Sequence, residues 1–192
     1  EPSHGLLQLI EPSGSEGWDP EKSVLSVVLP ELSRALPPER AWVERHLRSI
    51  DQVAAQHRLA ALLYPLRDGE RGRAVVAKLG PLRELGLLID ERLKLPVRER
   101  DFYAQYLLID EAPLLEKSAE PGALRRQLAA HGEALLVTLL TVAEHAADTA
   151  GEPRAALYRI THERLRAVIK EKPPLSAAEL ALSGKELMAA LG

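Results

Sequence analysis

The sequence predicts an all-α protein, built as a multi-helix body followed by a tail of short helices. Leucine, alanine, arginine and glutamate dominate the composition, and apolar residues recur at spacings of three and four, the period of a helix with one buried face. Prolines divide this pattern into segments of ordinary helix length, and several stand where a proline suits a first helical turn. Residues 23–32 are the one place where a strand competes, and we interpret them as helix interrupted at Pro30.

The first predicted elements follow a segment that has the composition of a loop. Residues 1–22 are predicted as an N-terminal segment, of which residues 11–21 are the clearest loop in the chain. Residues 37–56 are predicted as a helix with a single apolar stripe. The stripe consists of Trp42, Val43, Leu47, Ile50 and Val53.

Two further helices are predicted near the end of the chain. Residues 132–151 form a nearly wholly buried helix that ends at Gly151, with Leu135, Leu136, Leu139, Leu140 and Val142 inside. Residues 151–172 form an amphipathic helix with arginines on its outer face. Its predicted inner positions are Ala156, Ile160, Leu165 and Ile169.

Bulk properties exclude several classes of protein. The 192 residues suffice for one large domain or two small ones. The absence of cysteine excludes disulfides and thiolate nucleophiles, and no apolar run is long enough for a membrane span, so we expect a cytoplasmic protein without a membrane partner. Because the only methionine is Met188, we expect the chain to be a piece of a longer protein or a processed form.

Charge is distributed unevenly along the chain although the net charge is only −3. Residues 67–100 carry nine basic and six acidic side chains, and residues 152–172 carry six and three. Residues 101–151, between them, carry three basic and eight acidic side chains. The two positive segments predict either a basic binding face or the solvated faces of amphipathic helices.

No catalytic motif accompanies these helices. The chain has no phosphate-binding glycine loop, no His-Glu-x-x-His and no Gly-x-Ser-x-Gly, and no two histidines are spaced by four residues. Paired carboxylates such as Asp90-Glu91 are interpreted as caps or solvated charge. We therefore predict no catalytic residues, no metal ligands and no cofactor within this chain.

The last residues of the chain, 171–192, contain two Ser-x-x-Glu helix starts, Ser176 with Glu179 and Ser183 with Glu186. The second start lies within a longer pattern, which consists of Leu180, Leu182, Gly184, Glu186, Leu187 and Met188. This pattern resembles the Leu-x-(Val/Leu)-x-Gly-x-(Asp/Glu)-Leu-(Met/Ile) sequence in the tail of bacterial tRNA nucleotidyltransferases, which are CCA-adding and A-adding enzymes, and of the related poly(A) polymerases.

Three upstream blocks resemble the same family in the same order. They are VLPEL at 28–32, ERHLRSID at 44–51 continued by HRLAALLYPL at 57–66, and LKLPVRERDFYAQYL at 93–107. Many relatives carry His-Asp where this chain has Tyr64-Pro65, and these ligands act with an upstream histidine matched by His46. Since tyrosine and proline cannot replace those ligands, we predict a degenerate HD motif without metal-dependent phosphohydrolysis.

The resemblance implies a division of the chain and a missing catalytic part. It implies a helical body at 23–110 and a helical tail at 111–192 that is truncated at its C-terminus. The family's nucleotidyltransferase head is absent, because neither Gly-Gly-x-Val-Arg-Asp nor Asp-x-Asp occurs. Mg²⁺ and ATP or CTP would belong to that head, acting in cis or in trans, and we expect no nucleotidyl transfer by this chain alone.

In the family the body and tail bind the acceptor and TΨC arms of tRNA, so the resemblance implies RNA binding. We predict contacts from Lys94, Arg98, Arg100, Arg159, Arg164, Arg166, Lys170 and Lys185. Tyr158 is predicted either to stack on a ribose or base or to lie in the core. The alternative function is a non-catalytic protein-interaction or scaffold module derived from the same helical fold.

Overall fold

Helices make up all the regular structure of the computed structural model, which describes residues 26–27, 29–36, 40–80, 82–115 and 120–174. Within these residues there are ten α-helices, one 3-10 helix and no strand, so the predicted all-α class is confirmed. None of the helices in this part of the chain combines the length and the apolarity that a bilayer span requires.

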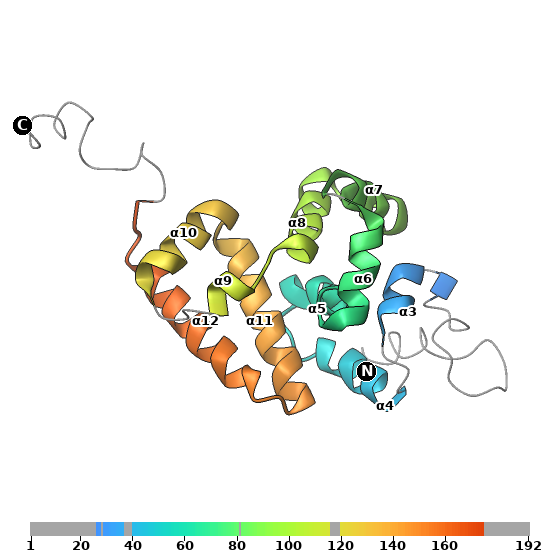
Figure 1. Ribbon diagram of the computed structural model, residues 1–192, viewed down its shortest axis with the longest axis horizontal. Coiled ribbons are helices and arrows are strands. Elements are labelled where there is room, and N and C mark those ends of the chain that lie inside the picture. Colours follow the sequence, from blue (N-terminus) through green and yellow to red (C-terminus); the bar gives the residue numbers. More distant parts are fainter. Residues whose placement is uncertain (1–25, 28, 37–39, 81, 116–119, 175–192) are drawn as a thin grey trace, which may run out of the picture.

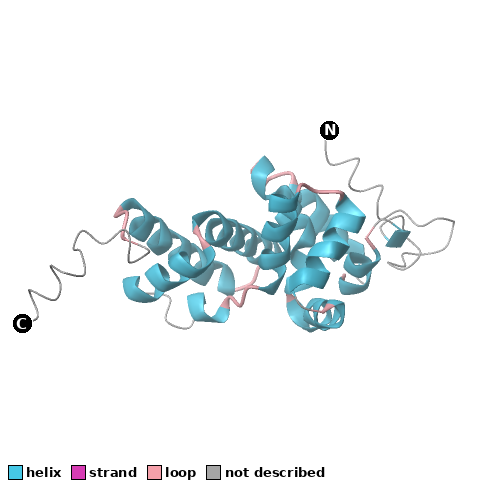
Figure 2. Ribbon diagram, turned by 90° about the horizontal axis from the view of Figure 1, so that it is seen from above, coloured by secondary structure: helices cyan, strands magenta, loops and turns pink. Residues whose placement is uncertain are grey.

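The helices form two groups that lie side by side (Figures 1 and 2). The first comprises α3 (Pro30–Ala35), α4 (Arg40–Ile50), η2 (Ala55–His57), α5 (Arg58–Arg67), α6 (Gly69–Leu79), α7 (Leu82–Leu93) and α8 (Val97–Leu108). The second comprises α9 (Ala112–Leu115), α10 (Pro121–His131), α11 (Glu133–Ala150) and α12 (Arg154–Lys170). The predicted boundary between residues 110 and 111 falls in the link between α8 and α9.

Helix α11 is the buried helix that the sequence predicts at residues 132–151. All five predicted core positions, from Leu135 to Val142, are at most 2% exposed. The helix ends at Gly151, which takes the left-handed conformation (φ 70°), and the N–H of Glu152 donates to the carbonyl of Ala147 at 2.8 Å. This is a Schellman end, which glycine adopts without steric cost.

Helix α11 also joins the two groups. It packs against α10 and α12 on one side and against α4, η2, α5 and α8 on the other, within one continuous set of buried apolar side chains. The predicted stripe of residues 37–56 belongs to this core, since Val43, Leu47, Ile50 and Val53 are buried and Trp42 is partly buried.

Helix α5 contains Pro65, at the position where the resemblance places the degenerate motif. Helix α6 crosses it closely at Gly72. A Cβ added to Gly72 would lie 2.1 Å from the Pro65 carbonyl oxygen and 2.7 Å from that of Leu66, so only glycine fits.

The prediction of which residues of 151–172 form the inner face is wrong, because the buried positions lie on a different side of the helix from most of the predicted ones. Leu165 is buried as predicted, but Ala156 is exposed, Ile160 is 43% exposed and Ile169 is only partly buried. The buried positions of α12 are Ala155, Tyr158, Thr161, His162, Leu165 and Val168. The inner face therefore includes three polar residues, whose burial an apolar stripe does not predict.

Two other predictions concern the two ends of the chain. Pro30 is the first residue of α3, so the helix there begins at the proline rather than continuing through it. The Ser-x-x-Glu boxes, the tail motif and Lys185 lie outside the described residues.

Candidate functional site

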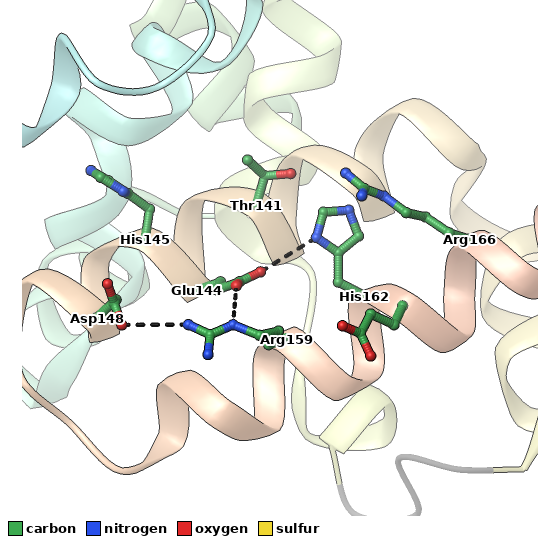
Figure 3. A pocket seen from close by; sticks show the side chains of 8 residues that line it. Thr141, Glu144, His145, Asp148, Arg159, His162 and Arg166 are labelled. Carbon is green, nitrogen blue, oxygen red and sulfur yellow. Dashed lines mark hydrogen bonds and ion pairs between the residues drawn. The ribbon is translucent and has the colours of Figure 1, made fainter.

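A groove between α11 and α12 gathers most of the titratable side chains of these two helices (Figure 3). Its volume is about 380 Å³. We call it the α11–α12 groove. It is lined by Thr141, Glu144, His145 and Asp148 from α11, and by Arg159, His162, Glu163 and Arg166 from α12.

Glu144 is the centre of the hydrogen bonding in this groove (Figure 3). Its Oε1 accepts a hydrogen bond from Arg159 Nε at 2.9 Å, and its Oε2 lies 3.5 Å from His162 Nδ1. Arg159 Nη2 also lies 3.5 Å from Asp148 Oδ1. The hydrogen bond to Glu144 raises the pKa of Arg159, so its charge is permanent and already matched by carboxylates.

The two histidines of the groove are held by different neighbours. His162 is buried, and burial together with the positive charge of Arg166 lowers its pKa although Glu144 opposes the shift. His162 is therefore neutral at pH 7, and its Nε2 has no hydrogen-bond partner among the described residues. His145 donates from Nε2 to the carbonyl of Ser49 on α4, at 2.9 Å.

The polar side chains of the groove are arranged as hydrogen bonds and ion pairs around Glu144. The hydroxyl of Thr141 has no described histidine or carboxylate bonded to it as a general base. Among the described residues, no group of three or more histidine, aspartate or glutamate side chains is placed to hold a metal ion. One end of the groove is a closed network around Glu144, while Arg166 at the other end has no ion pair with a described residue.

The position at which the resemblance places a degenerate HD motif is a buried polar region. His46 is 6% exposed and stacks on Trp42 with 5.1 Å between ring centroids, and Tyr64 is 2% exposed. Desolvation lowers the pKa of His46 to about 4, with His145 adding to the shift and the Ala61 backbone and Asp68 opposing it. Neither His46 Nε2 nor the Tyr64 hydroxyl has a partner among the described residues. The prediction that no metal binds here stays a prediction.

The predicted RNA contacts on α12 are all exposed. Arg159 is 53% exposed but occupied by Glu144 and Asp148, whereas Arg166 and Lys170 make no hydrogen bond or ion pair with a described residue. Arg164 is exposed as well. Tyr158 is fully buried, with its hydroxyl donating to Glu111 Oε1 at 2.8 Å, so it lies in the core and is not available for stacking.

The other predicted contacts lie on a different part of the molecule. Lys94 is exposed in the link between α7 and α8 with φ 52°, and Arg98 is exposed in the first turn of α8. Arg100 pairs with Asp101 at 2.8 Å. Figure 1 places α7 and α8 away from α12, so the structure does not bring the two predicted sets into one patch.

Several basic side chains of the two positive segments serve the fold instead. Arg67 is 5% exposed and donates to the carbonyls of Tyr106 and Ile109. Arg154 Nη2 contacts both carboxylate oxygens of Asp68, at 2.8 and 3.0 Å. Arg71 donates to the carbonyl of Leu36, and Arg92 pairs with Glu31. Sequence reasoning missed Glu144 and Asp148 as the partners of Arg159. The sequence feature that could have indicated this pairing is the short link at Gly151, because it makes α11 and α12 antiparallel neighbours.

The chain has no recognisable relative in the comparisons. No family model matches it, and neither the curated proteins nor the solved structures contain a significant match.

Proposed function

We propose that this chain is an RNA-binding helical region of a tRNA nucleotidyltransferase-like protein. It would position the acceptor arm of tRNA for a catalytic head that acts in cis or in trans. Four sequence blocks resemble the family in the family's order, and the all-α fold agrees with a body-and-tail array of helices. RNA binding needs no catalytic group in this chain, which fits the absence of the head's motifs from its sequence.

The observation that carries the proposal is the C-terminal half of α12. Residues 164–170 contain three basic side chains, Arg164, Arg166 and Lys170, and no acidic one, and all three are exposed. Exposed arginines and lysines on a helix bind phosphates without reading the base sequence, and binding releases counterions.

A purely structural role for these side chains makes a different prediction. Lys170 lies in the last turn of α12, where a basic residue interacts favourably with the helix macrodipole and contributes about 0.3–1 kcal/mol. If that were their only role, their removal would lower stability slightly and leave RNA binding unchanged.

The test is the double variant Arg166→Ala with Lys170→Ala, measured for binding to a tRNA acceptor minihelix. Titrations at several salt concentrations, beginning at low salt, give the slope of log K against log salt. We expect each lost contact to flatten that slope by somewhat less than one unit, equally for all minihelix sequences. The melting temperature should change little, because exposed charges contribute little to stability.

The matched control is Arg45→Ala with Arg48→Ala, which removes the same charge from exposed positions on α4. This control should leave the slope nearly unchanged. The proposal is overturned if both double variants bind like the unmodified chain, or if that chain does not bind the minihelix even at low salt.

A protein-interaction module is the second candidate, and the ion pairs favour it. Arg92, Arg100, Arg154 and Arg159 have acidic partners, so a large part of the positive charge is not available to phosphates. This candidate predicts that the chain binds no minihelix at any salt concentration.

A further inference from the structure

A second cavity lies between η2, α8 and the first turns of α11, and it shares no lining residue with the α11–α12 groove. Its volume is about 580 Å³, and we call it the α8–α11 pocket. Gln56 and His57 from η2, Phe102 from α8, and Glu133, Val137 and Thr138 from α11 line it. An apolar surface with a few convergent polar groups is typical of small-ligand sites of this size.

The polar side of the pocket has a defined pattern of donors and acceptors. Gln56 Nε2 lies 3.4 Å from His57 Nε2, and an amide nitrogen can only donate, so His57 Nε2 is the acceptor. His57 then carries its proton on Nδ1 and donates to Thr138 Oγ1 at 3.1 Å. Burial lowers the pKa of His57, and the neighbouring His162 adds to the shift, so this neutral form persists at pH 7.

This bonding leaves the amide of Gln56 partly unused. One N–H of Nε2 is directed to His57, while the second N–H and the Oε1 carbonyl make no hydrogen bond with a described residue. Gln56 is exposed and lines the pocket, so this donor and acceptor are available to a ligand. The carboxylate of Glu133 adds a second acceptor at the rim.

The apolar side of the pocket includes an aromatic ring. Phe102 is partly buried, and its ring is fixed edge-on against Tyr103, with 5.2 Å between centroids and an interplanar angle of 87°. Val137 is partly buried on the opposing helix. Arg98 precedes Phe102 by four residues, so it lies one turn away on the same side of α8, and it is exposed.

We propose that the α8–α11 pocket binds an unstacked adenine base. A side-chain amide with a free N–H and carbonyl pairs with adenine N7 and N6, and an aromatic ring provides the surface on which a base stacks. Glu133 would accept a further hydrogen bond from the exocyclic amine, and Arg98 would lie near the attached phosphate. The inference deepens the proposed RNA function but does not depend on α12. The base can come from an RNA strand or from a free nucleotide.

The first experiment titrates the whole chain with AMP and with IMP, following the amide NMR signals of Val137 and Thr138. IMP has the same shape as AMP but presents a carbonyl where adenine has its amine. We expect the chain to bind AMP about tenfold more tightly than IMP, because one bidentate amide–base contact discriminates by about that factor or more.

Two variants assign the binding to the pocket. Gln56→Glu removes the N–H donor at nearly constant size and should abolish most of the preference for AMP. Phe102→Leu removes the ring and should weaken AMP and IMP alike. The control Gln52→Glu makes the same charge change at an exposed residue that does not line the pocket, and should bind like the unmodified chain.

A second arm uses the oligonucleotides A6 and U6 to identify the source of the base. Tighter binding of A6 than of AMP assigns the base to an RNA strand, whereas equal binding assigns it to a free nucleotide. Either result supports the pocket. Equal affinity for AMP and IMP, or affinities that neither Gln56→Glu nor Phe102→Leu changes, would overturn it.

The test of the α8–α11 pocket can be separated from the test of RNA binding by α12. Gln56→Glu should leave the salt dependence of minihelix binding unchanged, and Arg166→Ala with Lys170→Ala should leave AMP binding unchanged. A chain that binds AMP selectively but no minihelix would retain this inference and lose the proposed function.

Discussion

Gly72 and Gly122 are both helical glycines, but a methyl group would meet different surroundings at the two positions. At Gly72 it would overlap the backbone oxygens of Pro65 and Leu66, which cannot move independently of α5. At Gly122 the nearest atom is the end of the Arg126 side chain, at 3.8 Å. The helix-favouring effect of alanine is therefore opposed by a clash at only one of them.

We expect Gly72→Ala to lower the free energy of unfolding by about 1–3 kcal/mol, as overpacking does, in spite of alanine's higher helix propensity. Gly122→Ala should raise it by about 0.4–1 kcal/mol. Urea denaturation measures both. Equal effects at the two positions would mean that α6 does not approach α5 as closely as the structure places it.

His46 makes stability depend on pH between its two pKa values. Its pKa is about 4 in the folded chain and 6.5 when solvated, so the unfolded state binds the proton first as the pH falls. Its contribution to stability is present above pH 6.5 and is lost as the pH drops towards 4. The loss is on the order of 3 kcal/mol.

The variant His46→Phe keeps a ring against Trp42 but cannot be protonated. Its free energy of unfolding should fall less steeply between pH 6.5 and pH 4 than that of the unmodified chain, as measured by urea denaturation at several pH values. His57 and His162, whose pKa values are also lowered, leave a residual slope. Parallel pH curves for the two proteins would contradict the assignment to His46.

Among the elements, α12 is held to the link before α9 by the hydrogen bond from Tyr158 to Glu111. The change Tyr158→Phe removes the hydroxyl that donates to Glu111 Oε1. We expect it to lower the free energy of unfolding by about 1.5–3 kcal/mol, the range for hydrogen bonds to charged groups. Thermal or chemical denaturation measures the change.

Tyr64→Phe is the matched control within α5. The Tyr64 hydroxyl is buried and has no partner among the described residues, so its removal should be neutral or stabilising. If Tyr64→Phe destabilised the chain as much as Tyr158→Phe, an unseen partner such as an ordered water would have to satisfy the Tyr64 hydroxyl.

At the scale of the helices, the sequence predicted the buried face where apolar residues alone define it. The core positions of α11 and the stripe of α4 follow directly from leucine, isoleucine and valine spacing. The phase of α12 did not, because Tyr158, Thr161 and His162 are buried through contacts with other helices. A hydrophobicity pattern counts such residues as polar. Glu111 and Glu144 supply the hydrogen-bonding partners that Tyr158 and His162 need inside, whereas the buried Thr161 hydroxyl has no partner among the described residues.

At the scale of the whole molecule, the candidate sites were less predictable than the fold. The exposure of Arg164, Arg166 and Lys170 is what charged side chains generally show, but the neutralisation of Arg159 depends on how α11 packs against α12. The α8–α11 pocket joins residues 56, 102 and 137, and no local pattern indicates that these positions meet. The sequence could therefore predict a charged helix face but could not predict which residues together form a site.

The contacts of α11 with both helix groups have a consequence for how the chain opens. A helix shared by two groups cannot leave one core without exposing the other, so the groups should not unfold independently. Native-state hydrogen exchange tests this. The amides at the centre of α11, around Leu136–Leu140, should exchange only through global unfolding and therefore slowest of all. Amides of α7, at the edge of the structure, should exchange through smaller openings that respond less to denaturant. Two separate unfolding transitions, with α11 following only one of them, would show that α11 couples the two helix groups more weakly than its burial implies. A single transition would make α11 the helix whose unfolding disrupts both groups at once.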